Sequence, residues 1–107
     1  MQTGLYIVGT PIGNLSDFSP RAIDVLKNVD LIAAEDTRVF GKLATHFDIK
    51  TKRVACHEHN ERDVVPDLIE KIQSGQSVAC VSDAGMPGVS DPGFRLVRAA
   101  RAAGVPV

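Results

Sequence analysis

The stretch SVACVSDAGMPGVSDPG, residues 77–93, contains the signals that decide the fold. Its first five residues (77–81) are small and mostly apolar, as in a strand that is covered on both faces. About a dozen residues rich in glycine, proline, serine and aspartate follow, more than an ordinary strand-to-helix connection needs. Asp91 and Pro92 then have the pattern of a helix cap and a first-turn proline. The stretch therefore predicts a strand, a long loop suited to binding, and a helix.

The same order of apolar run and helical pattern recurs along the chain. Strands are expected over 5–8, 31–34, 53–57 and 77–81, and a fifth is expected to begin at 105–107. Helices are expected behind the caps Ser19, Thr37 and Asp91, and near 63–65, where Pro66 would lie in a first turn. This alternation predicts an α/β fold: an open, mostly parallel five-stranded sheet with helices on both faces. Because the chain ends inside an expected strand, we expect residues 1–107 to be one domain of a longer protein.

Composition and charge limit the class of protein. The 107 residues suit one domain, and 44% apolar with 23% charged residues is the balance of a globular chain. The net charge of −1 gives no overall electrostatic signal for nucleic acid. Residues 37–62, however, carry six lysines and arginines against three acids, together with all three histidines. This segment is either a solvated face or a place for phosphates.

Membrane and redox signals are limited. No run is long and apolar enough to span a membrane, and the N-terminus lacks a signal-peptide pattern. Cys56 and Cys80 end apolar runs, which indicates buried free thiols in a reducing cytoplasm. We therefore expect a cytoplasmic protein without a membrane partner.

The carboxyl ends of parallel strands meet at one sheet edge, where ligands bind in such folds. Four loops are expected there: 9–19, 35–37, 57–62 and 82–91. The first lacks the Lys-Ser/Thr of a P-loop and the third glycine of a dinucleotide fingerprint. Glycines in the last would let a ligand approach the backbone closely, and prolines would hold its shape.

Two polar motifs at this edge allow several interpretations. AEDTR (34–38) could place acids that suit a helix dipole, bind a metal, or accept a phosphoryl group. HEHNE (57–61) could hold a metal, hydrogen-bond a ligand, or cap a helix. Its histidines lack helical i, i+4 spacing, so we expect no metal site.

Four motifs in register carry a resemblance to a known family: LYIVGTPIGNLSD (5–17), DLIAAEDTR (30–38), HEHNE (57–61) and VSDAGMPGVSDPG (81–93). Together they resemble the ribosomal RNA small-subunit methyltransferase I family, within the tetrapyrrole (corrin/porphyrin) methylase superfamily, over essentially the whole chain. The resemblance implies an S-adenosylmethionine-dependent methyltransferase of two α/β domains with the cofactor between them. This chain would be the N-terminal domain, its partners the missing C-terminal domain and a second copy in a homodimer. The implied reaction is methylation of a cytidine ribose 2′-hydroxyl in small-subunit ribosomal RNA.

Site residues follow from this resemblance and from the chemistry of the cofactor. Backbone N–H groups in the last loop suit the cofactor's carboxylate. The expected cofactor site is Ser82, Asp83, Ala84, Gly85, Pro87, Gly88 and Val89, with Pro11 opposite. A ribose hydroxyl benefits from a general base, and the candidates are Glu35, Asp36 and His57. Residues expected to contact RNA are Asn14, Arg38, His59, Asn60 and Arg62.

Two alternatives stay open at the level of sequence. A methyltransferase on the same fold could act on a tetrapyrrole or another small molecule. A non-enzymatic signalling or nucleotide-binding domain is the second alternative. A receiver domain would need an acid at the end of its third strand, where this chain has Cys56 and His57.

Overall fold

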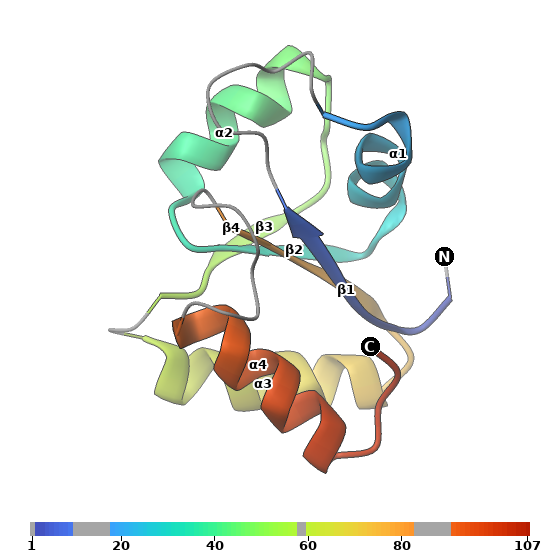
Figure 1. Cartoon of the computed structure of the whole chain (residues 1–107), viewed down its shortest axis with the longest axis vertical. Coiled ribbons are helices and arrows are strands. Elements are labelled where there is room, and N and C mark those ends of the chain that lie inside the picture. Colours follow the sequence, from blue (N-terminus) through green and yellow to red (C-terminus); the bar gives the residue numbers. More distant parts are fainter. Residues whose placement is uncertain (1, 10–17, 58–59, 83–90) are drawn as a thin grey trace.

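The computed structural model describes residues 2–9, 18–57, 60–82 and 91–107, without the side chains of residue 82 and residues 91–94. Its described part contains a parallel sheet of β1 (Gly4–Gly9), β2 (Leu31–Ala34), β3 (Arg53–Ala55) and β4 (Ser77–Ser82), in the order β1-β4-β2-β3. The helices are α1 (Pro20–Asn28), α2 (Thr37–His46), α3 (Glu61–Gln73) and α4 (Asp91–Ala102). Figure 1 shows α1 and α2 on one face of the sheet and α3 and α4 on the other. The α/β class and the three-layer arrangement are confirmed.

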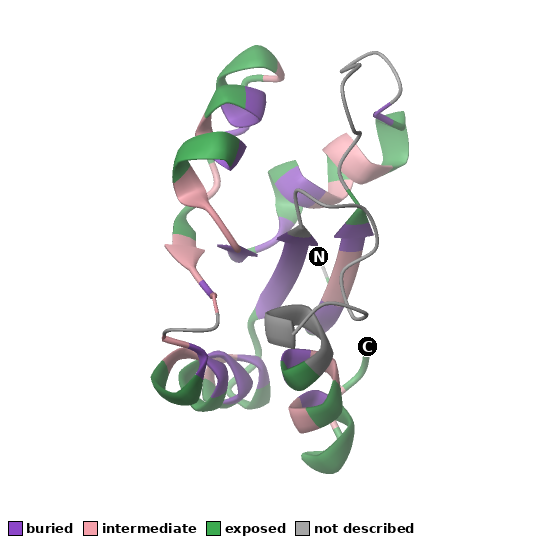
Figure 2. Ribbon diagram, turned by 60° about the vertical axis from the view of Figure 1, so that its left-hand side comes forward, coloured by how far each residue is buried: buried purple, intermediate pink, exposed green. Residues whose placement is uncertain are grey.

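Two apolar clusters, one on each face, hold these layers together. Successive strand side chains point to opposite faces, so in β2 Leu31 and Ala33 join one cluster while Ile32 and Ala34 join the other. The helical members of the first cluster are Val65, Leu68, Ile69 and Ile72 of α3 with Leu96 and Ala100 of α4. Those of the second are Leu26 of α1 with Phe40, Leu43 and Ala44 of α2. All four residues of β2 are buried (Figure 2), which explains why its sequence is apolar throughout.

The expected fifth strand is absent from the described residues. Residues 105–107 lie beside β1, where the N–H of Leu5 donates to the carbonyl of Pro106 over 2.8 Å. Pro106 has no N–H with which to continue a ladder, so this contact does not become a strand. A Cβ at Gly4 would lie 3.1 Å from the Pro106 oxygen, which explains the glycine there. The prediction of a five-stranded sheet was therefore wrong for the described chain, which has four strands.

The N-terminal caps of α1 and α2 differ in how well they were predicted. Ser19 caps α1, as predicted: its Oγ accepts from the N–H of Ala22 over 3.1 Å, with Pro20 as the first helical residue. Thr37 was expected to cap α2, and this was wrong. Asp36 is the cap, because its carboxylate reaches two N–H groups of the first turn. Thr37 is the first residue of the helix.

The third strand and the third helix also differ from expectation. The strand was expected over 53–57 but ends at Ala55, because the Asn60 side chain, and not a neighbouring strand, bonds the Ala55 carbonyl and the His57 N–H. The helix was expected to begin near 63–65 and begins at Glu61, with Pro66 inside it. The proline removes only one backbone hydrogen bond, and both it and Arg62, whose carbonyl loses that bond, are exposed to water.

Several remaining expectations are met by described residues. Cys56 and Cys80 are buried free thiols. The helix α4 ends at Ala102, before Gly104 with its φ of +73°. It begins at Asp91, although the predicted capping by this side chain lies outside the described residues. None of the described helices is long and apolar enough to cross a membrane.

Candidate functional site

The carboxyl edge of the sheet brings together chain segments that are far apart in sequence. Gly9 at the end of β1 pairs with Ser82 at the end of β4, and Ala34 at the end of β2 pairs with Val81. Beyond β3, the N–H of Cys56 donates to the Ala34 carbonyl over 2.8 Å. The segment after β4 therefore starts between those that follow β1 and β2. Because α1 and α4 cover opposite faces, this is a topological switch point, where open parallel sheets bind ligands.

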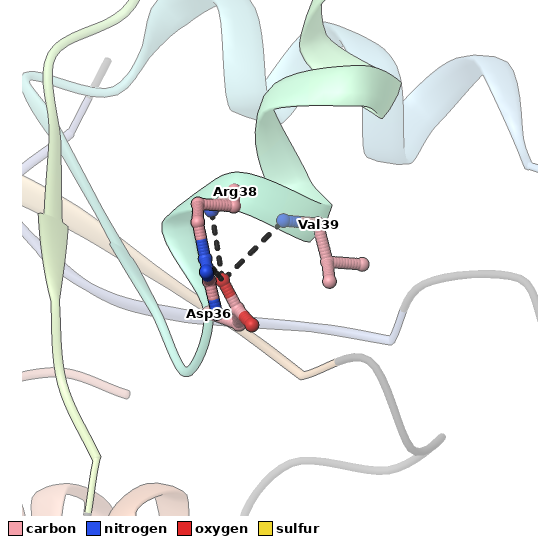
Figure 3. Close-up of polar contacts among 3 residues, drawn as sticks. All are labelled: Asp36, Arg38 and Val39. Atoms are coloured by element: carbon pink, nitrogen blue, oxygen red, sulfur yellow. Dashed lines mark hydrogen bonds and ion pairs between the residues drawn. The ribbon is translucent and has the colours of Figure 1, made fainter.

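Asp36 has a structural role at this edge, shown in Figure 3. Its Oδ1 accepts hydrogen bonds from the N–H groups of Arg38 at 2.9 Å and Val39 at 3.4 Å. The Nε atom of Arg38 lies 3.5 Å from the same oxygen. The N–H of Arg38, aided by that of Val39 and by the guanidinium, holds the pKa of Asp36 below its usual value. Asp36 is therefore a carboxylate fixed at the first turn of α2, and its predicted catalytic role stays a prediction.

Glu35 and His57 follow two neighbouring strands. Glu35 comes directly after β2 and is half-buried, while His57 comes two residues after β3 and is also half-buried. Burial raises the pKa of the Cys56 thiol to about 11, and the charges of Glu61 and Glu35 add to this effect. Because Ala34 pairs with Ala55, Glu35 and Cys56 follow paired positions at the ends of β2 and β3. The structure brings these two predicted base candidates to the same part of the edge.

Asn60 holds the backbone around His57 in place. Its Oδ1 accepts from the N–H of His57 over 2.8 Å, and its Nδ2 donates to the Ala55 carbonyl over 3.0 Å. The His57 carbonyl in turn accepts from the N–H groups of Asn60 and Glu61. Asn60 was expected to contact substrate, whereas both ends of its amide group already have partners within the chain. The direct contact it was expected to make stays a prediction.

Glu61 is a residue that the sequence analysis did not single out. It is buried, and its Oε1 lies 3.1 Å from Nε of Arg95, so that it joins α3 to α4. Among the described residues, its Oε2 has no hydrogen-bond partner. Its position at the end of HEHNE was visible in the sequence. Its pairing with an arginine on α4 could be seen only in the fold.

The other predicted site residues divide into three groups. Arg38 and Arg62 are exposed and lie in the first turns of α2 and α3, which cover opposite faces of the sheet. Ser82 ends β4 at the switch point, but its side chain is not described. The remaining predictions lie outside the described residues: Pro11, Asn14, His59, Asp83, Ala84, Gly85, Pro87, Gly88 and Val89. Over 2–9, 18–57, 60–82 and 91–107, no group of three or more His, Cys, Asp or Glu could hold a metal ion.

Comparison with curated proteins gives relatives with one shared name. The ribosomal RNA small subunit methyltransferase I of Vibrio cholerae is 58% identical over 103 residues, which cover 96% of this chain and 36% of the relative. The protein of that name from Synechocystis sp. is 54% identical over 103 residues, covering 96% of this chain and 37% of the relative. The chain thus spans about a third of the length of the curated relatives it matches.

Solved structures and family comparison agree with this result. Uroporphyrin-III-C-methyltransferase from Thermus thermophilus matches with a TM-score of 0.74 and 25% identity, covering 99% of this chain and 46% of that one. Diphthine synthase matches in fold, with a TM-score of 0.72 and 20% identity over 95% of this chain and 41% of that one. The sequence model of the Tetrapyrrole (Corrin/Porphyrin) Methylases matches residues 4–107. The resemblance carried by the four motifs is confirmed, and the chain belongs to the tetrapyrrole (corrin/porphyrin) methylase family.

Proposed function

We propose that this chain is the N-terminal α/β domain of an S-adenosylmethionine-dependent methyltransferase that modifies a cytidine ribose 2′-hydroxyl in small-subunit ribosomal RNA. The observation that carries the proposal is the identity of 54–59% with relatives named ribosomal RNA small subunit methyltransferase I. Those relatives are about three times as long, which supports a second domain that completes the cofactor site. A cytoplasmic homodimer acting on the assembled small subunit is part of the proposal and is implied by the resemblance alone.

The charge of the carboxyl edge fits the proposed cofactor. S-adenosylmethionine has two positive groups, a sulfonium and an ammonium, and the described part of this edge carries the carboxylate of Glu35, while that of Asp36 is already paired with Arg38. The switch point between β1 and β4 is where a ligand is expected in an open sheet. The residues that would hold the cofactor are Pro11, Ser82, Asp83, Ala84, Gly85, Pro87, Gly88 and Val89. When bound, S-adenosylmethionine would supply an electrophilic methyl group.

In the proposed reaction, residues of this chain would align the reacting groups and accept the proton of the ribose hydroxyl. Alignment of nucleophile, methyl carbon and sulfur can supply much of the acceleration of a direct displacement. Either Glu35 or His57 would accept the proton of the ribose hydroxyl. Asp36 is the weaker candidate, because its oxygen already accepts two backbone hydrogen bonds and its pKa is lowered. Asn60 would act as a positioning residue for His57.

The predicted RNA contacts stay part of the proposal. Arg38 and Arg62 have exposed side chains that could reach phosphates from the first turns of α2 and α3. Asn14, His59 and Asn60 complete the proposed set of RNA-contacting residues. Asn60 would have to exchange one of its hydrogen bonds within the chain for a bond to RNA.

One alternative substrate class has a specific observation in its favour. The likeness to uroporphyrin-III-C-methyltransferase, at 25% identity, supports methylation of a tetrapyrrole carbon on the same fold. RNA binding that weakens steeply with salt would distinguish the two, because RNA carries a condensed layer of counterions that phosphate contacts release, and a small tetrapyrrole does not carry such a layer. We do not propose the non-enzymatic alternative, since the curated relatives named above are methyltransferases.

The test uses the full-length protein that contains this chain. Calorimetry should show binding of S-adenosylmethionine. Incubation with tritiated cofactor and unmodified small ribosomal subunits should then label the RNA, and digestion to nucleosides should place the label in 2′-O-methylcytidine. Label in another nucleoside would overturn the assigned position, and transfer to a tetrapyrrole but not to RNA would overturn the substrate class.

A second measurement separates the two candidate bases. Glu35→Gln and His57→Gln should have unequal effects on kcat, and the variant that lacks the true base should lose the acid limb of the pH–rate profile, because that limb reports protonation of the base at low pH. Lys42→Ala, an exposed change on α2, is the matched control that should leave kcat unchanged.

A further inference from the structure

A hollow lies at the amino edge of the sheet, opposite the proposed cofactor site. Its volume is about 580 Å³. It is bounded by the end of α1, the start of β2, and the segment that leads from α2 into β3. The lining residues are Lys27, Val29, Asp30, Asp48, Lys50, Thr51 and Lys52. None of them belongs to the set assigned to the proposed reaction.

Hydrogen bonds between distant segments fix the frame of this hollow. The Thr51 hydroxyl donates to the carbonyl of Leu26 at the end of α1, over 2.6 Å. The N–H of Ile32 donates to the carbonyl of Lys52 over 2.9 Å. The N–H of Asp30 donates to the carbonyl and the Oγ of Ser77 at 3.0 and 3.1 Å. The backbone that carries the lysines is therefore set before any ligand arrives, which lowers the cost of binding.

The lysines that line the hollow are available to bind an anionic ligand. Asp30 is occupied, since its Oδ2 accepts from the N–H of Ser77 at 2.8 Å and from its Oγ at 3.1 Å. Nζ of Lys50 lies 3.9 Å from Oδ1 of Asp48, and both side chains are largely exposed, so their ion pair is weak. Lys27 and Lys52 make no ion pair with any residue that the structure describes. A helix C-terminus favours a nearby cation such as Lys27, but this local effect does not account for Lys52.

Taken with the proposed function, on which this inference rests, the geometry points to a second RNA contact. We propose that the hollow binds the sugar–phosphate backbone of the substrate RNA through Lys27 and Lys52, with Lys50 at its rim. At about 3.3 Å per residue, β2 and its flanking residues separate the two edges by roughly 15 Å. A structured ribosomal RNA extends much further than this. One RNA molecule can therefore contact both edges, with its ribose at one and a phosphate at the other.

The test measures, by anisotropy over a salt series, the binding of a fluorescein-labelled RNA hairpin to the full-length protein that contains this chain. Lys27→Ala/Lys52→Ala should weaken binding on the order of tenfold at about 0.1 M salt and lower the salt slope by about 1.5. The matched control is Arg98→Ala/Arg101→Ala, which removes the same charge from exposed positions on α4, across the sheet. This control variant should retain most of the RNA affinity and most of its dependence on salt.

Each other outcome counts against the site. Equal losses in both double variants would show attraction by net charge, and no loss in the lysine variant would remove the hollow from RNA binding. A poly-glutamate peptide that binds as tightly through the same lysines would overturn the assignment to RNA. Methyl transfer by the full-length protein is a separate readout, so this inference and the proposed function can fail independently. Unchanged far-UV circular dichroism would show that both variants fold.

Discussion

Hydrogen bonds of described polar side chains differ in range between the two edges of the sheet. At the carboxyl edge, Asp36 caps the helix that it precedes and Asn60 bridges residues only three and five positions away. At the amino edge, Asp30 bonds to Ser77 and Thr51 to Leu26, which are 47 and 25 positions apart in the chain. Local bonds shape one loop, whereas long-range bonds fix the distance between elements. The bonds of Asp30 and Thr51 therefore tie elements together at the amino edge, whereas those of Asp36 and Asn60 are local, and the described link between elements at the carboxyl edge is the ion pair of Glu61 with Arg95.

The largest loss of stability among polar changes is expected at the carboxyl edge. Asn60→Ala removes both bonds of the amide and leaves the half-buried N–H of His57 without its partner. The cost is expected to be about 2 kcal/mol, from urea unfolding. Asn60→Asp keeps the acceptor for that N–H and should cost less. Equal losses in the two variants would show that the bond to His57 does not support this turn.

A smaller loss is expected at the amino edge. Ser77→Ala removes a buried hydroxyl that exchanges hydrogen bonds with Asp30, but the backbone bonds between the two residues remain. We expect a cost of about 1 kcal/mol in urea unfolding. RNA affinity should also fall, because the frame of the hollow loosens. A destabilised variant with unchanged RNA affinity would separate the frame from the proposed binding.

Low pH should reduce the stability of the folded chain through one aspartate at each edge, Asp30 and Asp36. Hydrogen bonds from Ser77 hold the pKa of Asp30 below its usual value, and the N–H of Arg38 does the same for Asp36. A lowered folded pKa gives stability that is complete well above the unfolded value and is lost as pH falls through the folded one. Melting temperatures should therefore drop below about pH 4, and less steeply for Asp30→Asn and Asp36→Asn. Parallel curves for wild type and variants would contradict this linkage.

The smallest effect is expected in the chemical labelling of the two thiols, Cys56 and Cys80. Burial raises the pKa of Cys56 to about 11 and that of Cys80 to about 12, so both are protonated at neutral pH. Ellman's reagent at about pH 8 should label neither thiol in the folded chain and both in urea. Fast labelling of Cys56 alone would show that the carboxyl edge opens at β3.

The features that the sequence predicted correctly depend on residues close together in the chain. Apolar runs gave the four strands, and the Ser19–Pro20 pair located the start of α1, because each depends on a few adjacent residues. Neighbouring candidates were harder: Asp36 and Thr37 could each cap α2, and only the reach of the carboxylate selects Asp36. The stretch 105–107 had strand composition, but its proline cannot continue a ladder.

Long-range relations could not be predicted from one sequence. Lys27 and Lys52 are separated by a helix end and a whole strand–helix unit, and only the strand order brings them to one hollow. The ion pair of Glu61 with Arg95 likewise depends on α3 and α4 packing on the same face. For the candidate site, the meeting of the loops at one edge was predictable from the parallel sheet, while their order and the engagement of Asp36 and Asn60 with their own backbone were not.

The most direct test of the account compares the two edges within one experiment, the binding of S-adenosylmethionine to the full-length protein by calorimetry. Gly85→Val changes the proposed cofactor loop, which lies outside the described residues, and Lys27→Ala/Lys52→Ala changes the hollow. We expect Gly85→Val to reduce cofactor affinity by a few kcal/mol while the melting temperature is maintained. The lysine variant should keep the wild-type Kd. An unchanged Kd in Gly85→Val would contradict the assignment of the cofactor to the carboxyl edge.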